Sequence, residues 1–237
     1  SEGGGVWARS EKRITLSAQA REVLGTDDDT FTPAELIRVI LAAPVDLLWN
    51  GGIGTYVKAK SEEHPAAADQ ANDSVRLDGS ELRCKVVGEG GNLGFTQLGR
   101  VEFARTGDRI NTDFLDNSGG VDCSDREVNL KILLRIAVER GELTEDERVA
   151  LIAEVASDVT DRVIEDNFRQ AAVLSKDVHD AQRRLESYED LMAVLERDVG
   201  LDRAMERLPD SEEMMERARD GLGLTRPELA VLMAYAK

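Results

Sequence analysis

The sequence predicts an α/β region followed by an all-α region, with the change near residue 125. Before that point, short apolar runs alternate with glycine-rich loops, which is typical of a parallel α/β sheet. After it, apolar residues recur almost entirely at helical spacing. We therefore expect part of a parallel sheet in residues 1–125 and a helical domain in residues 126–237.

The composition narrows the classes of protein to consider. The 237 residues can form one or two domains, and 41% of them are hydrophobic. The formal net charge of −17 argues against a nucleic-acid partner, because it repels phosphates. No apolar run is long enough for a membrane span, and no signal peptide is visible. Two cysteines, Cys84 and Cys123, are too few for a disulfide framework or a structural zinc site. We expect a cytoplasmic protein with no membrane partner and no metal site.

The first helix and strand carry clear local signals. Thr32, Pro33 and Glu35 form a capping box with proline at the first helical position, and the helix should end before Pro44. The next run, 45–49, is short and apolar and therefore predicts a buried strand. The loop that follows it has the sequence Asn50-Gly51-Gly52-Ile53-Gly54-Thr55.

The pattern of a strand followed by a polar, glycine-rich loop then recurs. Residues 84–87 predict a second strand, 88–94 a glycine-rich loop and 96–104 a helix. Residues 109–115 predict a third strand that runs into Asn117-Ser118-Gly119-Gly120. Ligands bind parallel sheets at the carboxyl ends of the strands, so these loops are the candidate binding region.

The second region reads as four or five antiparallel helices, each burying one apolar stripe. Capping boxes at Ser124 and Thr144 should start two helices, the first running to about Glu139. A stripe from Val149 to Phe168 marks the second helix, and a stripe from 178 to 195 marks a third that stops near Gly200. The remaining expected helices are 211–221 and one capped at Thr225.

The loop 88–94 is the first candidate for chemistry. The dinucleotide-binding fingerprint requires a third glycine where this sequence has Leu93, so the fingerprint is absent. A tight turn that needs positive φ explains the glycines equally well. A bare turn does not require Asn92, whose amide can both donate and accept hydrogen bonds.

The segment after the third predicted strand is the second candidate. Asn117 and Ser124 can supply polar contacts there, and Ser124 is also expected to cap a helix. His64 and His179 have no partner at the spacing of a metal site or a proton relay, and no basic residue adjoins Cys123 to activate it. The histidines are therefore expected in a loop and on a solvated helix surface.

Three long segments resemble one family. The large bacterial-type NAD-specific glutamate dehydrogenases have segments similar to DLLWNGGIGTYVKA, CKVVGEGGNLGFTQLGRVEFA and RINTDFLDNSGGVDCSDREVN. The start and the end of the chain, GGGVWARSEKRITLSAQAREVLG and LTRPELAVLMAYAK, resemble the same family. The resemblance implies a Rossmann-like NAD-binding domain whose later half is residues 1–125. It also implies oxidative deamination of L-glutamate to 2-oxoglutarate and ammonium with NAD, a role in nitrogen metabolism and a homo-oligomer.

The resemblance also implies roles for individual residues. Glu89-Gly90-Gly91-Asn92 looks like the family's EGAN segment, and Asn50-Gly51-Gly52 stands where the preceding strand meets the dinucleotide. Asn117 belongs to a variant of the NAGGV motif and faces the nicotinamide and the substrate. Ser124 matches the serine that binds the distal carboxylate of the substrate.

Some of the family's features are not found in these residues. The catalytic lysine and aspartate and the diphosphate-binding turn are expected before Ser1, so we expect a fragment that is inactive by itself and contains no catalytic residue. Two other functions stay open on the residues alone. The first is a non-catalytic helical module for assembly or regulation, and the second is an acidic helical scaffold for a protein partner.

Overall fold

The computed structural model describes residues 5–237, so the first four residues of the expected NAD-binding half lie outside it. Contacts divide the chain into two compact units. The first contains the residues up to Asp113 together with Asp177–Lys237, and the second contains Phe114–Lys176. The expected domain boundary near residue 125 stays a prediction.

Within the first unit, the central element is a three-stranded parallel sheet in the order β3 (Leu47–Asn50), β6 (Val86–Glu89) and β7 (Arg109–Ile110). Two smaller sheets accompany it. β1 (Ile14–Thr15) pairs antiparallel with β2 (Thr30–Phe31), and β4 (Val57–Lys58) pairs parallel with β5 (Leu77–Asp78). The expected parallel α/β arrangement is therefore confirmed.

The remaining elements of this unit are helices. They are α1 (Ala18–Leu24), α2 (Pro33–Leu41), η1 (His64–Ala67), η2 (Gln70–Asn72), η3 (Gly79–Glu81), α3 (Gln97–Arg105), α7 (Leu185–Val199), α8 (Ser211–Asp220) and α9 (Arg226–Ala236). α9 packs against α3 and α7, and α7 packs against α8. The capping boxes at Thr32 and Thr225 start α2 and α9 as expected.

One hydrophobic core supports the parallel sheet. Its members, all buried, are Val57, Leu77, Leu82, Cys84, Val87, Phe95, Phe103 and Ile110. The strand expected to be buried is half-buried on one face and exposed on the other, where Leu47 and Trp49 of β3 are 53% and 60% exposed. Their face of the sheet has no covering layer in the described chain, and the sequence pattern alone does not reveal this.

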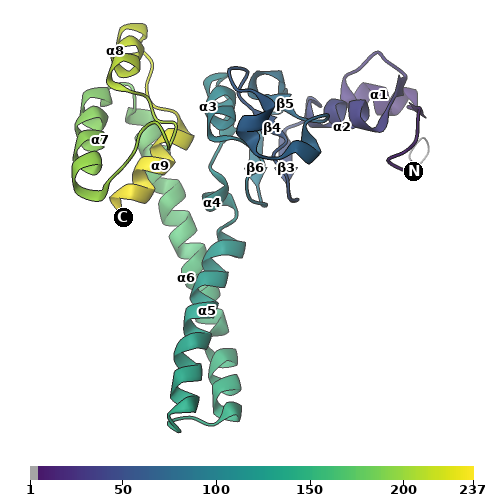
Figure 1. Cartoon of the computed structure of the whole chain (residues 1–237). Helices are drawn as coiled ribbons and strands as arrows, with labels where there is room; N and C mark the ends of the chain where they lie inside the picture. Colours follow the sequence, from purple (N-terminus) through teal and green to yellow (C-terminus); the bar gives the residue numbers. More distant parts are fainter. Residues whose placement is uncertain (1–4) are drawn as a thin grey trace. The chain divides into compact units, whose positions relative to one another are not determined.

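The second unit is built from the antiparallel helices α5 (Ser118–Glu139) and α6 (Glu145–Asp180), of which the last turn belongs to the first unit (Figure 1). The expected capping box at Thr144 starts α6. α6 runs on to Asp180, so Val178 belongs to it and not to the next helix. The expected buried stripe on α6 is wrong at three positions, since Val149, Ile164 and Phe168 are 56%, 62% and 72% exposed. Its other members, Ile152, Val155 and Val159, are half-buried.

The segment 109–120 differs most from the expectation. The third strand ends at Ile110, and Asp113–Asp116 form the short helix α4. Asn117 then immediately precedes α5, whose first turn contains Gly119 and Gly120. The amides of Gly120 and Val121 donate to the Asn117 carbonyl at 3.0 Å, so the predicted glycine loop is the start of a helix. Neither glycine has positive φ, and a first turn tolerates them.

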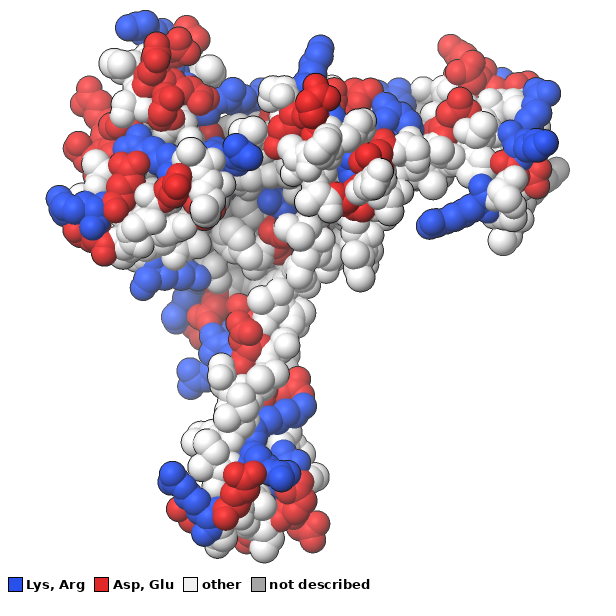
Figure 2. All heavy atoms as spheres, viewed as in Figure 1, with Lys and Arg blue, Asp and Glu red and all other residues white. Residues whose placement is uncertain are grey.

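Charge is spread over the surface. Figure 2 shows acidic and basic side chains interspersed on the visible face, although acidic residues outnumber basic ones by 47 to 30. No helix in residues 5–237 is both long and apolar enough to cross a membrane.

Candidate functional site

The carboxyl ends of β3 and β6 bring two predicted site segments together. The strands are paired in register, so that Asn50 lies opposite Glu89. Both strands end at this point, and β3 is followed by the loop 50–55 and β6 by the loop 90–94. This is the edge at which parallel sheets bind ligands.

Glycines allow the two loops to touch. The Gly91 amide donates to the Asn50 carbonyl at 2.9 Å, and a Cβ on Gly91 would overlap the Gly52 carbonyl. A Cβ on Gly94 would overlap the Asn50 side-chain amide. A Cβ on Gly52, by contrast, would meet nothing within 4 Å, so the backbone there is open on one side. The contact therefore requires glycine at 91 and 94 for steric reasons.

Trp49 lies beside the same loops. A Cβ on Gly88 would come within 2.6 Å of the indole, and one on Gly90 would overlap it. The indole thus lies close against the backbone of β6 and its following loop, and it remains 60% exposed.

Glu89 occupies a different environment from the other predicted cofactor residues. It is 0% exposed, and its carboxylate accepts from Arg100 of α3 at 2.6 and 3.0 Å and from the Phe95 amide at 3.2 Å. The Arg100 side chain is 6% exposed and also lies 3.3 Å from Asp113. The buried carboxylate therefore connects the end of the loop 90–94, through the Phe95 amide, to Arg100 of α3.

Asn92 is exposed at the crest of this loop. The next residue, Leu93, has a φ of +59°, and both of its backbone polar groups bond to side chains. Its N–H donates to Asp113 at 2.8 Å, and its carbonyl accepts from the Thr55 hydroxyl at 2.7 Å. The predicted residues Asn50, Gly51, Gly52, Glu89, Gly90, Gly91 and Asn92 thus form one cluster of strand ends and loops.

Thr55 is itself held firmly. Its amide donates to Asp69 at 2.7 Å, and its carbonyl accepts from Arg76, which is 1% exposed. Hydrogen bonds from the Asn72 amide and the Thr55 N–H lower the pKa of Asp69, which keeps it ionised as an acceptor. Half-buried His64 also contacts Arg76, at 2.9 Å.

Asn117 and Ser124 belong to the second unit. Beside Asn117, the buried Ser118 hydroxyl lies 2.9 Å from the side-chain amide of Asn167, which also donates to the Leu115 carbonyl at 2.6 Å. These bonds hold the start of α5 against α6. Ser124 is exposed within α5 and does not cap a helix, so that prediction is wrong. Helix α5 begins at Ser118, with Gly119 and Gly120 in its first turn, so Ser124 lies inside the helix.

The sequence analysis missed Thr55, Arg76, Arg100 and Asp113. Thr55 and Asp113 adjoin predicted site loops, which is a weak signal. Arg76 and Arg100 give none, because their contacts to the site join distant residues: Arg76 bonds to Thr55, 21 residues away, and Arg100 bonds to Glu89, 11 residues away.

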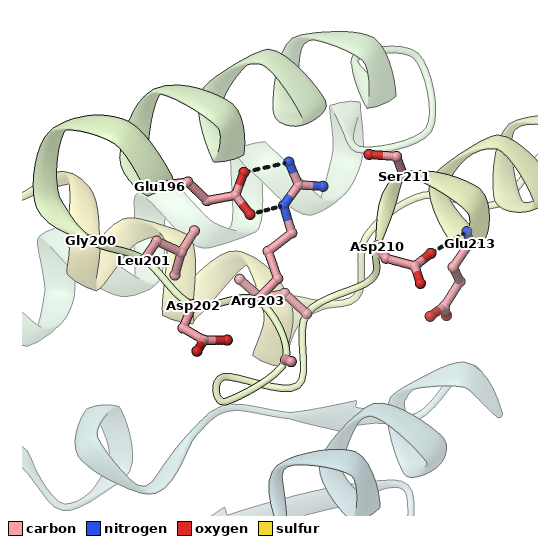
Figure 3. A pocket seen from close by; sticks show the side chains of 10 residues that line it. Glu196, Gly200, Leu201, Asp202, Arg203, Asp210, Ser211 and Glu213 are labelled. Atoms are coloured by element: carbon pink, nitrogen blue, oxygen red, sulfur yellow. Dashed lines mark hydrogen bonds and ion pairs between the residues drawn. The ribbon is translucent and has the colours of Figure 1, made fainter.

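A separate pocket of about 780 Å³ lies between the end of α7 and the start of α8 (Figure 3). Its polar side chains already bond to neighbouring side chains or to backbone. Arg203 pairs with Glu189 and Glu196, the Ser211 hydroxyl donates to Glu189, and Asp210 caps α8 by accepting from the Glu213 amide. Burial raises the pKa of Glu189, but hydrogen bonds from Ser211 and Arg203 outweigh it, so the pKa is lowered. These contacts hold α7 and α8 together.

We also searched the described part of the chain for a metal site and for a reactive cysteine. No group of three or more histidine, cysteine or acidic side chains is placed to hold a metal ion. Burial raises the pKa of the Cys84 thiol to about 11, so it is unsuited to act as a nucleophile.

Comparison with known proteins identifies the family. Residues 1–177 match the family described as "Bacterial NAD-glutamate dehydrogenase, catalytic domain". Proteins named NAD-specific glutamate dehydrogenase from Halomonas elongata and Pseudomonas aeruginosa are 49% and 52% identical over 237 residues, and one from Mycobacterium tuberculosis is 49% identical over 243. Each match covers all of this chain and 15% of the relative.

The fold and the paired loops define part of an α/β domain with a parallel sheet. The chain belongs to the bacterial NAD-glutamate dehydrogenase family. It spans about 15% of the length of these relatives.

Proposed function

We propose that this chain forms the nicotinamide side of the NAD site in an NAD-dependent glutamate dehydrogenase and that it also supplies a contact to the substrate. The full enzyme would convert L-glutamate, NAD⁺ and water to 2-oxoglutarate, ammonium, NADH and a proton. One observation carries the proposal: in a member of this family, the two predicted motif loops meet at the carboxyl edge of adjacent parallel strands.

Two features of the loops support a dinucleotide site. The backbone is open beside Gly52, and Asn92 is an exposed residue at the crest of its loop. We assign Asn50, Gly51, Gly52, Gly90, Gly91 and Asn92 to contacts with NAD, together with Asn117, which immediately precedes α5. Glu89 holds the loop 90–94 in place through its buried bonds to Arg100 and to the Phe95 amide. When bound, the nicotinamide accepts a hydride from the substrate.

The residues of this chain orient the reactants. An amide can donate to and accept from the carboxamide of a nicotinamide, so Asn92 and Asn117 fix the ring that receives the hydride. Ser124 donates to the distal carboxylate of glutamate, and this selects a five-carbon dicarboxylate. The proton-transfer groups are assigned to the part of the enzyme that precedes this chain.

The remaining expectations complete the proposal. A homo-oligomer is inferred from the family resemblance. A cytoplasmic location agrees with both cysteines being free, since disulfides are rare in a reducing compartment.

The test uses the full-length enzyme. NADH formation is measured with L-glutamate against L-aspartate and with NAD against NADP, in the wild type and in Asn92→Ala. Asn129→Ala, an exposed asparagine on α5, is the control. We expect glutamate- and NAD-dependent turnover that collapses in Asn92→Ala and survives in the control. Full activity of Asn92→Ala would remove Asn92 from the site.

A non-catalytic helical module is the second candidate. Exposed aliphatic side chains on α5 favour it, namely Val128, Ile132, Leu133 and Ile136. If the full-length protein turned over no amino acid, this assembly function would replace the catalytic one.

A further inference from the structure

Leu93 has a backbone conformation that its own side chain does not explain. Its φ of +59° lies in the left-handed region, which residues with a Cβ disfavour, and its side chain is 65% exposed. Among residues 5–237, Ala68 and Arg207 are the other non-glycine residues with positive φ, and both close turns, bonding back to Pro65 and Ala204. Leu93 instead lies in the loop between β6 and α3. Such backbone strain persists only where the surroundings impose it, and it clusters at functional sites.

Two side chains impose this conformation. Asp113 accepts from the Leu93 N–H at 2.8 Å, and the Thr55 hydroxyl donates to the Leu93 carbonyl at 2.7 Å. The Leu93 N–H and the Asn92 carbonyl belong to one planar peptide group. Asp113 therefore fixes the peptide plane between Asn92 and Leu93, and Thr55 fixes the peptide plane between Leu93 and Gly94.

Both side chains are anchored from behind. The backbone of Thr55 bonds to Asp69 and to the buried guanidinium of Arg76. Asp113 lies 3.3 Å from Arg100, which is itself paired with the fully buried Glu89. The two hydrogen bonds to Leu93 thus connect an exposed loop to two buried charged groups, so the crest of the loop is positioned in the free protein.

We propose that Thr55, Leu93 and Asp113 form a clamp that sets the direction of the Asn92 amide. The three are positioning residues that act through the backbone of Asn92, and the inference rests on the proposed function of Asn92 at the nicotinamide. Leu93 stands where the dinucleotide fingerprint has glycine. A glycine there reaches the same φ but also many others, so a leucine held in place restricts the loop more strongly.

The test begins with the Thr55 hydroxyl in the full-length enzyme. Thr55→Val keeps the shape of the side chain and removes the donor, and Thr55→Ser keeps the donor. We expect Thr55→Val to lower kcat/KM for NAD about tenfold, the scale of one lost hydrogen bond, and Thr55→Ser to stay near wild type. Without NAD, peptide 88–96 should exchange its amide hydrogens faster in Thr55→Val than in Thr55→Ser. Equal kinetics and equal exchange in the two variants would overturn the clamp.

A double-mutant cycle with Asn92→Ala then tests the route of action. If the clamp acts through Asn92, Thr55→Val has little further effect on kcat/KM in the Asn92→Ala background. A full tenfold effect in that background would overturn the clamp while leaving Asn92 in the site. An Asn92→Ala enzyme with wild-type kinetics would instead overturn the proposed function of Asn92.

Leu93→Gly gives a second measurement should Thr55→Val fail to fold. Glycine relieves the strain, so a purely structural role predicts an unchanged kcat/KM and an equal or higher Tm. The clamp predicts a lower kcat/KM for NAD at an equal or higher Tm, with the loss again absent in the Asn92→Ala background. Wild-type kinetics in Leu93→Gly would overturn the proposal.

Discussion

Arg100→Met should destabilise the segment 86–105 far more than Arg105→Met, although both arginines lie on α3 and both form an ion pair. Arg100 pairs with Glu89, and these side chains are 6% and 0% exposed. Arg105 pairs with Glu213 at 2.9 Å, with both side chains nearly half exposed. Removing one partner of a buried pair costs about 3–5 kcal/mol, because the remaining charge is stranded. An exposed pair contributes about 0–1 kcal/mol.

Native-state hydrogen exchange on the full-length enzyme measures this difference locally. A loss of about 3–5 kcal/mol accelerates exchange of the protected amides roughly 10²- to 4 × 10³-fold, at about tenfold per 1.4 kcal/mol. Arg105→Met should change the rates by less than about fivefold. Adding Glu89→Leu to Arg100→Met should restore part of the protection, since the stranded carboxylate is then gone. Similar exchange in the two single arginine variants would refute the reasoning.

Three further predictions concern single residues. Ser124→Ala in the full-length enzyme should raise KM for glutamate by a contact of about 1–3 kcal/mol while KM for NAD stays unchanged, and an unaltered glutamate KM would remove this serine from the site. Gly94→Ala should speed hydrogen exchange in the loop 88–96 through overpacking that costs about 1–3 kcal/mol, whereas Gly52→Ala, with open space around its Cβ, should not; equal exchange would contradict the steric argument. Iodoacetamide at pH 8 should alkylate Cys123 well before Cys84, as followed by mass spectrometry, because burial raises the pKa of Cys84 to about 11; equal rates would exclude this.

Local interactions explain which parts of the fold could be predicted. The capping boxes at Thr32, Thr144 and Thr225 start helices as expected, and Gly200 and Gly221 end two others. Each of these signals acts within about four residues, so the neighbouring sequence contains all the partners. The parallel order of the strands also followed from the alternation of apolar runs and glycine loops.

Burial was harder to predict. Leu47 and Trp49 have the pattern of a buried strand, and Phe168 that of a buried helix face, yet all three are exposed in the described chain. An apolar pattern shows which face seeks a partner but not whether one is present. Segment 109–115 failed for a related reason: a short segment with few apolar residues is compatible with strand or helix, and pairing with β6 ends at Ile110.

The sequence by itself determined the family, the parallel α/β character and the loops that carry the candidate NAD contacts. Only the tertiary structure decided what holds those loops. Glu89 meets Arg100 eleven residues away, and Thr55 reaches Leu93 across 38 residues. Within each motif, the residues assigned to a ligand are neighbours in the sequence. The groups that fix their geometry are brought in by folding, and no spacing in the sequence records them.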